Sequence, residues 1–237
     1  MRKNLDEVLG RIEKAAQRAG RSSNDIELVA VSKTHPAEVL RAASAAGVTV
    51  FGENKVQEGE AKIVEIGRDA AEWHLIGHLQ SNKARKAVQL FDVIQSLDSV
   101  ELAKRLERNC IEDARTELPV FVQIDLAGEA TKSGIAENDL PNLVECLKTC
   151  KCLKFHGLMT VPPYFEDPDD VRPYFRKLRE IRDKLLSRNA FTNGRGELSM
   201  GMSHDFEVAI EEGATVVRVG TAIFGDRDIM SVRDRSF

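Results

Sequence analysis

Lys33 stands at a position where a lysine can do covalent chemistry. It ends an apolar run rich in β-branched residues, 26–33, and Pro36 follows shortly after. The run is too short to span a membrane and predicts a buried strand. A lysine at the end of a buried strand can lose its proton through desolvation, and the free amine can attack a carbonyl group to form a Schiff base. Taken alone, however, the position also fits a strand-end lysine that extends its ammonium to solvent.

Two later segments, 199–205 and 218–225, predict a phosphate site. Their glycines let the backbone come close to a ligand, and Ser203 and Thr221 supply hydroxyl groups. A helix that begins near Asp205 would add free N–H groups, which favour anions. Barrel proteins commonly bind phosphate between the loops that follow their last two strands.

Arg218 lies two residues before Gly220 and faces the same way if this segment is a strand. If Gly220 faces a ligand, Arg218 faces it from deeper in the fold, where its charge needs an acceptor. A packing glycine beside a structural ion pair is the alternative. A lysine nucleophile opposite a phosphate site is typical of a Schiff-base aldolase acting on a sugar phosphate, or of a pyridoxal 5'-phosphate (PLP) site. Lys33 on the first strand, with Arg-x-Gly on the last, favours a PLP site of the alanine racemase type.

Strand-like and helix-like segments alternate along the whole chain. The expected strands are 26–33, 48–54, 72–78, 93–98, 118–125, 152–161, 197–202 and 216–225. Helical patterns lie between them, and a leading helix covers roughly residues 3–19. Eight such units predict a (β/α)8 barrel, an α/β fold. An open doubly wound sheet is less favoured, because no G-x-G-x-x-G follows the first strand. No linker or composition break divides residues 1–237, so we expect one domain.

The composition excludes several classes of protein. The chain has 237 residues with 34 basic and 38 acidic side chains, a net charge of -4, which argues against a broad nucleic-acid-binding surface. No stretch approaches the roughly 20 apolar residues of a membrane span, and the charged, helix-like N-terminus is not typical of a secretory signal. We therefore expect a cytoplasmic protein that binds neither nucleic acid nor membrane.

The spacing of cysteines and histidines does not predict a metal site. Cys146, Cys150 and Cys152 cluster on an expected helix and the turn after it, but they match no closed zinc pattern. His74 and His78 alternate onto one face of the expected third strand, without a clear third ligand. We expect reduced thiols, and histidines that pack and form hydrogen bonds.

Several motifs, in order from residue 29 to residue 225, resemble those of the pyridoxal phosphate homeostasis proteins. They are VSKTHPAE, FGENKVQE, EWHLIGHLQSNK, KSGI, GLMT, LSMGMSHDFEVAI and VRVGTAIFG. Proteins of this family are stand-alone barrels that resemble the N-terminal domain of alanine racemase. The resemblance implies that PLP is the cofactor and that Lys33 carries it as a Schiff base.

The same resemblance implies roles for other residues. Arg218 meets the pyridine nitrogen. The phosphate is served by Ser203, Gly220 and Thr221, and the pocket is lined by Asn54, Ser199 and Met200. The chain departs from the family pattern at His35, Lys55 and His204, where other residues are frequent. These departures affect fine contacts and not the cofactor.

We expect cofactor binding without substantial turnover. An arginine at the ring nitrogen keeps that nitrogen unprotonated, which weakens PLP as an electron sink. Racemases also use a tyrosine base from another domain, which this chain is not expected to carry. We therefore expect storage, buffering or delivery of PLP by a monomer, with transient contacts to PLP-dependent apo-enzymes. A PLP-dependent amino-acid racemase and a sugar-phosphate aldolase are the alternatives.

Overall fold

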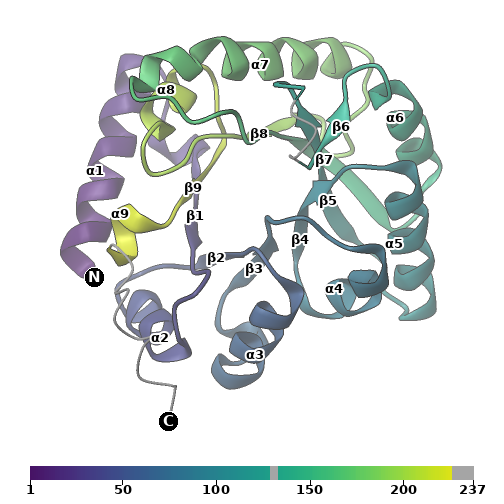
Figure 1. The fold of residues 1–237 in the computed structure, drawn as a ribbon, viewed down its shortest axis with the longest axis horizontal. Coiled ribbons are helices and arrows are strands. Elements are labelled where there is room, and N and C mark those ends of the chain that lie inside the picture. Colours follow the sequence, from purple (N-terminus) through teal and green to yellow (C-terminus); the bar gives the residue numbers. More distant parts are fainter. Residues whose placement is uncertain (129–132, 226–237) are drawn as a thin grey trace.

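The computed structural model describes residues 1–128 and 133–225, and eight parallel strands close into a barrel (Figure 1). In order around the ring they are β1 (Glu27–Val31), β2 (Val50–Glu53), β3 (Glu72–Leu75), β4 (Val93–Leu97), β5 (Leu118–Asp125), β7 (Leu153–Met159), β8 (Glu197–Ser199) and β9 (Val216–Val219). Pairing of β9 with β1 and of β4 with β5 closes the ring. The short strand β6 (Ile135–Ala136) pairs only with the end of β5. The predicted (β/α)8 barrel is confirmed.

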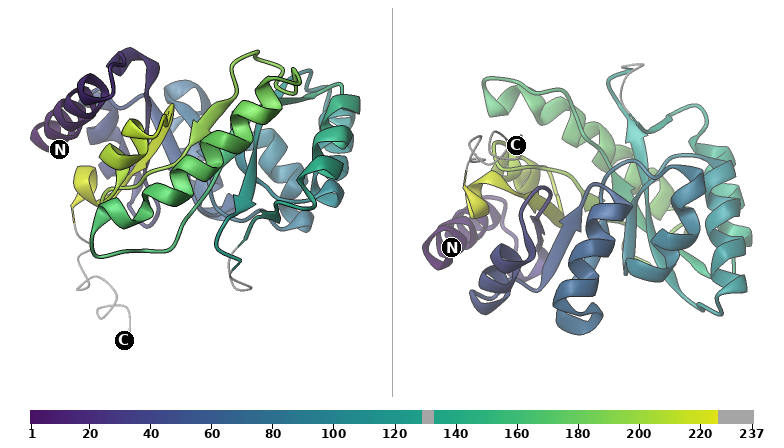
Figure 2. Two further views of the ribbon diagram at one scale, coloured as in Figure 1. Left: turned by 90° about the horizontal axis from the view of Figure 1, so that it is seen from above. Right: turned by 60° about the horizontal axis from the view of Figure 1, so that its bottom comes forward.

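Helices surround the barrel. They are α1 (Arg2–Arg18), α2 (Ala37–Ala45), α3 (Val56–Ile66), α4 (Ala84–Leu90), α5 (Val100–Glu112), α6 (Leu140–Thr149), α7 (Arg172–Leu186), α8 (Phe206–Glu211) and α9 (Thr221–Phe224). Short 3-10 turns lie at Ser23–Asp25, Arg68–Ala70, Ser81–Lys83 and Pro168–Val171. The leading helix α1 packs against α8 and α9, on the outside of the barrel (Figure 2).

The barrel wall separates two hydrophobic clusters. Alternate residues of a strand face opposite sides of the wall, so Val29 points into the barrel while Ala30 packs toward the helices. The inner cluster consists of Val29, Val50, Val93, Phe121, Met159 and Val216. These apolar side chains pack against one another inside the barrel.

Seven of the eight barrel strands end earlier than the sequence predicted, and the ends of β8 and β9 lie at the candidate site. β8 ends at Ser199, because Gly201 turns the chain with a left-handed φ of 94°. The expected strand over 216–225 ends at Val219, and the residues after Gly220 form the short helix α9. Residues that favour strands, Thr221, Ile223 and Phe224, continue beyond Val219, so sequence alone could not place the end of the strand.

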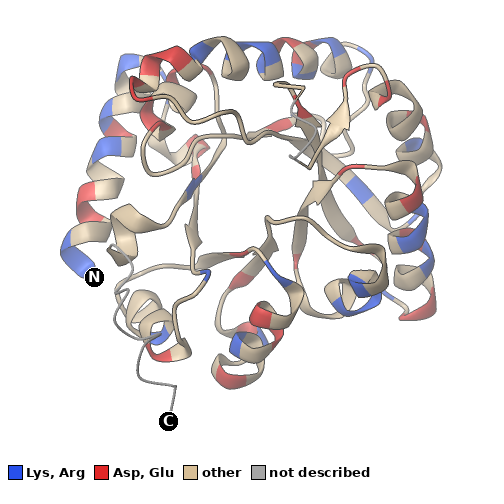
Figure 3. Cartoon of the chain, in the orientation of Figure 1, with Lys and Arg blue, Asp and Glu red and all other residues tan. Residues whose placement is uncertain are grey.

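Charged residues of both signs alternate along the outer helices (Figure 3). Many pair between neighbours, such as Arg11 of α1 with Glu207 of α8 and Lys86 of α4 with Glu60 of α3, each at 2.7 Å. Exposed pairs of this kind each contribute little to stability. The outer ring is therefore a mixed polar surface, and the ends of the barrel are where buried polar groups gather.

Candidate functional site

Lys33 lies two residues beyond β1, at the carboxyl ends of the strands, and is partly buried. The backbone before it is tethered from α3, because the Lys62 ammonium donates to Ser32 O at 2.7 Å and to Glu53 Oε1 at 2.6 Å. The Ser32 hydroxyl donates to the same carboxylate oxygen at 2.6 Å. Within residues 1–128 and 133–225, the Lys33 ammonium forms no hydrogen bond or ion pair. The main chain just before Lys33 is thus held in place, and the ammonium at the end of its side chain is available to a ligand.

The ion pair that tethers this loop is buried, with the Lys62 side chain 7% exposed and the Glu53 side chain 0% exposed. Burial raises the pKa of the Glu53 carboxyl, while the charge and hydrogen bond of Lys62 oppose the rise. The sequence analysis missed Lys62. A signal was available, since Lys62 shares the buried stripe of α3 with Val56 and Ile63. A lysine on such a stripe needs a buried partner.

Arg218 is 3% exposed inside the barrel. Its guanidinium donates to Ser199 Oγ at 2.6 Å and to Thr160 O at 2.8 Å. Burial lowers the pKa of Arg218 to about 10, with the negative charge of Asp205 opposing the change. Both acceptors are neutral, and they use two of the five N–H donors that a guanidinium carries. Arg218 therefore keeps donors for a further acceptor.

The two segments predicted to bind phosphate meet in the structure. Ser203 Oγ accepts hydrogen bonds from the amides of Gly220 at 3.2 Å and Ala222 at 3.5 Å. The Arg218 amide also donates to Gly201 O at 3.0 Å. A Cβ on Gly220 would lie 3.3 Å from Val31 O, tighter than ordinary contact, so the missing side chain lets this backbone approach β1. Ser203, Gly220 and the start of α9 thus line one corner beside the end of β1.

The remaining predicted site residues differ in their burial and in their contacts. Ser199 contacts Arg218 directly. Asn54 follows β2 and is partly buried, and Thr221 is exposed at the first position of α9. Met200 is fully buried and belongs to the outer hydrophobic cluster, which gives it a packing role. A role for Asn54, Thr221 or Met200 in lining a pocket stays a prediction.

A chain of hydrogen bonds, which sequence reasoning missed, runs from Arg218 through the barrel interior. Because a guanidinium only donates, the Ser199 oxygen accepts from Arg218 and its own proton goes to Gln95 Oε1 at 2.6 Å. Gln95 Nε2 then donates to His74 Nδ1 at 2.8 Å, which leaves the imidazole proton on Nε2, 2.9 Å from Glu72 Oε1. Ser199, Gln95 and His74 are all buried. The chain links the carboxyl end of the barrel to its amino end.

Comparison with known proteins identifies the family. The model of the alanine racemase N-terminal domain matches residues 4–228. The pyridoxal phosphate homeostasis protein of Aquifex aeolicus is 46% identical over 94% of this chain and 96% of its own, and that of Pseudomonas aeruginosa is 44% identical over 95% of each. This chain belongs to the pyridoxal phosphate homeostasis protein family. The motif resemblance is confirmed.

Solved structures agree with this family. PipY of Synechococcus elongatus, a structure with PLP bound, superposes with a TM-score of 0.80 at 39% identity, over 91% of this chain and 100% of that one. Alanine racemase of Corynebacterium glutamicum matches with a TM-score of 0.65 at 19% identity, over 95% of this chain and 62% of that longer one. The second match shows only that the fold is shared.

The histidines and cysteines considered in the sequence analysis are placed as follows. His78 lies beyond the end of β3, is exposed, and stands 3.3 Å from Asp98, whereas His74 is buried in the barrel. All four cysteines are free, and burial raises the pKa of Cys110 and Cys150 to about 12. Lys132 of the KSGI motif lies outside the described residues. None of the helices in the described part of the chain combines the length and the apolar character that crossing a membrane requires.

Proposed function

We propose that this protein binds PLP at the carboxyl ends of its strands and holds it on Lys33 as a Schiff base. It stores, buffers or delivers the cofactor without substantial turnover. The observation that carries the proposal is Arg218, a buried cation with neutral acceptors and unused donors, because such a group fits a pyridine nitrogen. The PLP-bound structure of a 39% identical relative supports the same ligand.

Three features of this chain fit the three functional groups of PLP. The cofactor supplies an aldehyde, a ring nitrogen and a phosphate. Lys33 presents a tethered, unpaired amine for the aldehyde. Arg218 offers N–H donors to the ring nitrogen from the barrel interior, and the corner formed by Ser203, Gly220 and the start of α9 offers hydroxyl and backbone groups to the phosphate.

The same residues favour holding over turnover. Arginine donates a hydrogen bond and leaves the ring nitrogen without a proton, whereas enzymes that fully stabilise a carbanion place a carboxylate there. Lys33 is only partly buried, so another amine can reach the bond it forms and displace it. In release by amine exchange, the incoming amine forms a new C–N bond to the cofactor and gives up protons, while the bond to Lys33 breaks and the Lys33 amine regains a proton.

The test is the visible absorption spectrum of the purified protein before and after borohydride. We expect a Schiff-base band that borohydride removes, with the reduced cofactor on the Lys33 peptide in a mass spectrum. Lys33→Ala abolishes the band, and Lys55→Ala, at an exposed neighbour, retains it. Absence of the band after addition of PLP would return the Schiff-base aldolase to first place.

A second assay addresses turnover. We expect no racemisation of amino acids above a control with free PLP. Racemisation that is substantial and is lost in Lys33→Ala would replace the holding function with the racemase alternative.

We further propose that residues 1–237 act as one domain, that the protein is a cytoplasmic monomer, and that it contacts PLP-dependent apo-enzymes transiently. The mixed charges of the outer helices support a monomer, because they present an interspersed polar surface (Figure 3). Light scattering at micromolar concentration measures the mass, and a dimer mass would refute the monomer. Reactivation of an apo-enzyme faster than by an equal amount of free PLP would support direct delivery.

A further inference from the structure

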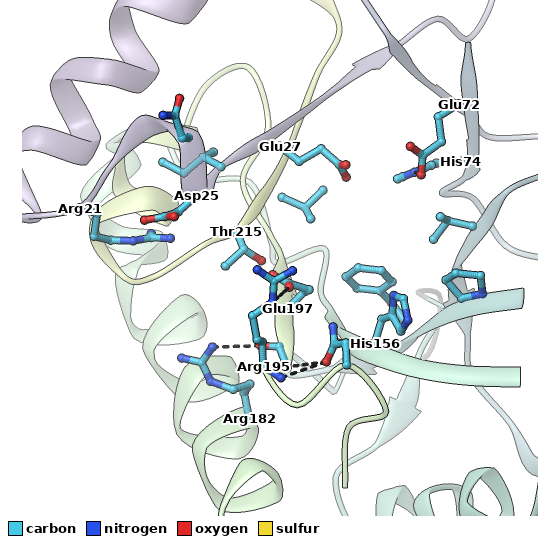
Figure 4. Close-up of a pocket in the computed structure, with 18 residues that line it drawn as sticks. Arg21, Asp25, Glu27, Glu72, His74, His156, Arg182, Arg195, Glu197 and Thr215 are labelled. Atoms are coloured by element: carbon cyan, nitrogen blue, oxygen red, sulfur yellow. Dashed lines mark hydrogen bonds and ion pairs between the residues drawn. The ribbon is translucent and has the colours of Figure 1, made fainter. Parts of the chain in front are cut away.

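A cavity of about 610 Å³ opens at the amino ends of the strands, opposite Lys33 (Figure 4). Glu27 and Glu72, which begin β1 and β3, and His74 all line it. The inner hydrophobic cluster lies between this cavity and the carboxyl end, and the buried hydrogen-bond chain joins the two. The proposed cofactor site does not use this cavity.

Three potential metal ligands converge at one side of this cavity. One oxygen each of Glu27 and Glu72 and one nitrogen of His74 lie within 4.8 Å of one another, and Figure 4 shows the two carboxylates directed toward the same space. The Glu72 carboxylate accepts a hydrogen bond from His74. The partly buried Glu27 carboxylate has neither a hydrogen bond nor an ion pair among the described residues.

Two carboxylates this close repel one another unless a positive charge lies between them or one of them is protonated, and burial raises the pKa of Glu27. The cavity contains arginines, but their described contacts lie elsewhere. Arg21 donates to the main-chain oxygens of Ile210 and Ala214, and Arg195 pairs with Glu197 at 3.4 Å. A structural ion pair of Glu72 with His74 explains those two residues, whereas Glu27 has only the more distant electrostatic attraction of His74.

We propose that Glu27, Glu72 and His74 bind a divalent transition-metal cation at the amino end of the barrel. Carboxylate oxygens and imidazole nitrogens lie roughly 2.0–2.2 Å from such an ion, so ligand atoms around it are about 3–4 Å apart. The observed separations within 4.8 Å need only a small closure. The mixed oxygen and nitrogen set suits manganese, iron or zinc, and the open cavity leaves room for water ligands. The sequence analysis predicted no metal site, because it found no clear third ligand beside His74 and His78; Glu27 and Glu72 were not considered.

His74 also connects this site to Arg218. When Nε2 binds a cation, its proton moves to Nδ1, and Gln95 must turn its amide over so that Oε1 accepts from Nδ1. Gln95 Nε2 then donates to Ser199 Oγ, which also accepts from Arg218. The Ser199 hydroxyl keeps its hydrogen but no longer donates it to Gln95. Cation binding at one end thus changes the hydrogen bonding of Arg218's partner at the other. This step rests on the proposed PLP function.

The first experiment measures Mn²⁺ binding by the full-length, cofactor-free protein, from the loss of the free-ion signal in electron paramagnetic resonance. Mn²⁺ prefers oxygen and nitrogen ligands, so the cysteines do not compete. We expect one bound ion, and affinity at least about tenfold weaker in Glu27→Gln and Glu72→Gln, since even outer partners of a ligand change affinity about 10- to 100-fold. Glu197→Gln is the matched control, because it removes the same charge from the same cavity and should bind like wild type.

Two results would overturn the site. One is no bound ion at millimolar Mn²⁺, and the other is an equal loss of Mn²⁺ affinity in all three variants, which would indicate only that the cavity is negatively charged.

The second experiment adds Mn²⁺ to protein loaded with PLP. We expect the absorption band to shift in wild type and to stay unchanged in Glu72→Gln, which also controls for chelation by free PLP. An unchanged wild-type band with bound Mn²⁺ would refute the coupling. A missing band would refute the PLP function and leave the first result intact.

Discussion

Lys62 offers the sharpest test of how the loop before Lys33 is held. Replacement by methionine keeps the length of the side chain and removes the ammonium that bonds Glu53 and Ser32. The Glu53 side chain is fully buried, and loss of one partner of a buried pair typically costs about 3–5 kcal/mol. We expect Lys62→Met to lower the free energy of unfolding by about that amount at pH 7. We also expect weaker PLP binding, because the Ser32 carbonyl is released.

The loss should depend on pH in a defined direction. Burial raises the pKa of Glu53, and removal of Lys62 takes away the interactions that oppose the rise. The folded variant then binds more protons than the unfolded chain between the ordinary and the raised pKa of this carboxyl, so its stability increases as the pH falls through that window. The deficit of Lys62→Met relative to wild type should therefore shrink from pH 7 toward pH 5.

Urea unfolding measures both effects, with the fluorescence of the single, fully buried Trp73 and circular dichroism as probes. Adding Glu53→Gln to Lys62→Met replaces the buried pair by neutral groups, and we expect it to recover at least about half of the loss. Lys86→Met is the control, since its pair with Glu60 is 46% and 39% exposed and should contribute less than about 1 kcal/mol. A loss below about 1 kcal/mol in Lys62→Met, or no recovery in the double variant, would refute this reasoning.

Three further predictions concern the scaffold. Burial would raise the pKa of Glu212, but hydrogen bonds from Arg176 and Arg172 and the charge of Arg179 hold it below its ordinary value. Glu212→Gln should therefore lower the free energy of unfolding, measured in urea at pH 7, by about 1–3 kcal/mol. This difference from wild type should vanish as the pH falls through the lowered pKa, and a difference that is constant with pH would contradict the prediction. In Gly157→Ala the new Cβ would lie 2.2 Å from Glu197 O between β7 and β8, so the thermal midpoint of unfolding should fall. Gly10→Ala is the control, because a Cβ there meets open space, and it should be neutral or stabilise the protein by up to about 1 kcal/mol. Iodoacetamide at pH 8 should label partly buried Cys146 well before fully buried Cys110, whose pKa burial raises to about 12; equal labelling by mass spectrometry would show that the thiol is accessible.

The sequence by itself determined the architecture and the family, and it predicted the chemistry of the site. Alternating strand and helix patterns are local properties, and eight such units close into a barrel with few alternatives. The two-residue period of a strand predicted that Arg218 and Gly220 share one face, but β9 ends at Val219, so this period does not extend to Gly220. Family motifs then indicated PLP and Lys33. The barrel and the family are confirmed, and the roles of individual site residues stay predictions.

The tertiary structure alone decided which distant side chains meet. Lys62 reaches Ser32 from α3, and Gln95 joins His74 to Ser199 across the barrel, through contacts between residues 21 to 104 positions apart. Glu27 approaches His74 only because β2 sets β1 and β3 in register. Local periodicity states which face a residue occupies, but strand register and ring closure decide what lies opposite it. No local pattern encodes these long-range pairings. They hold the main chain before Lys33, orient Arg218 and bring together the three residues of the proposed cation site.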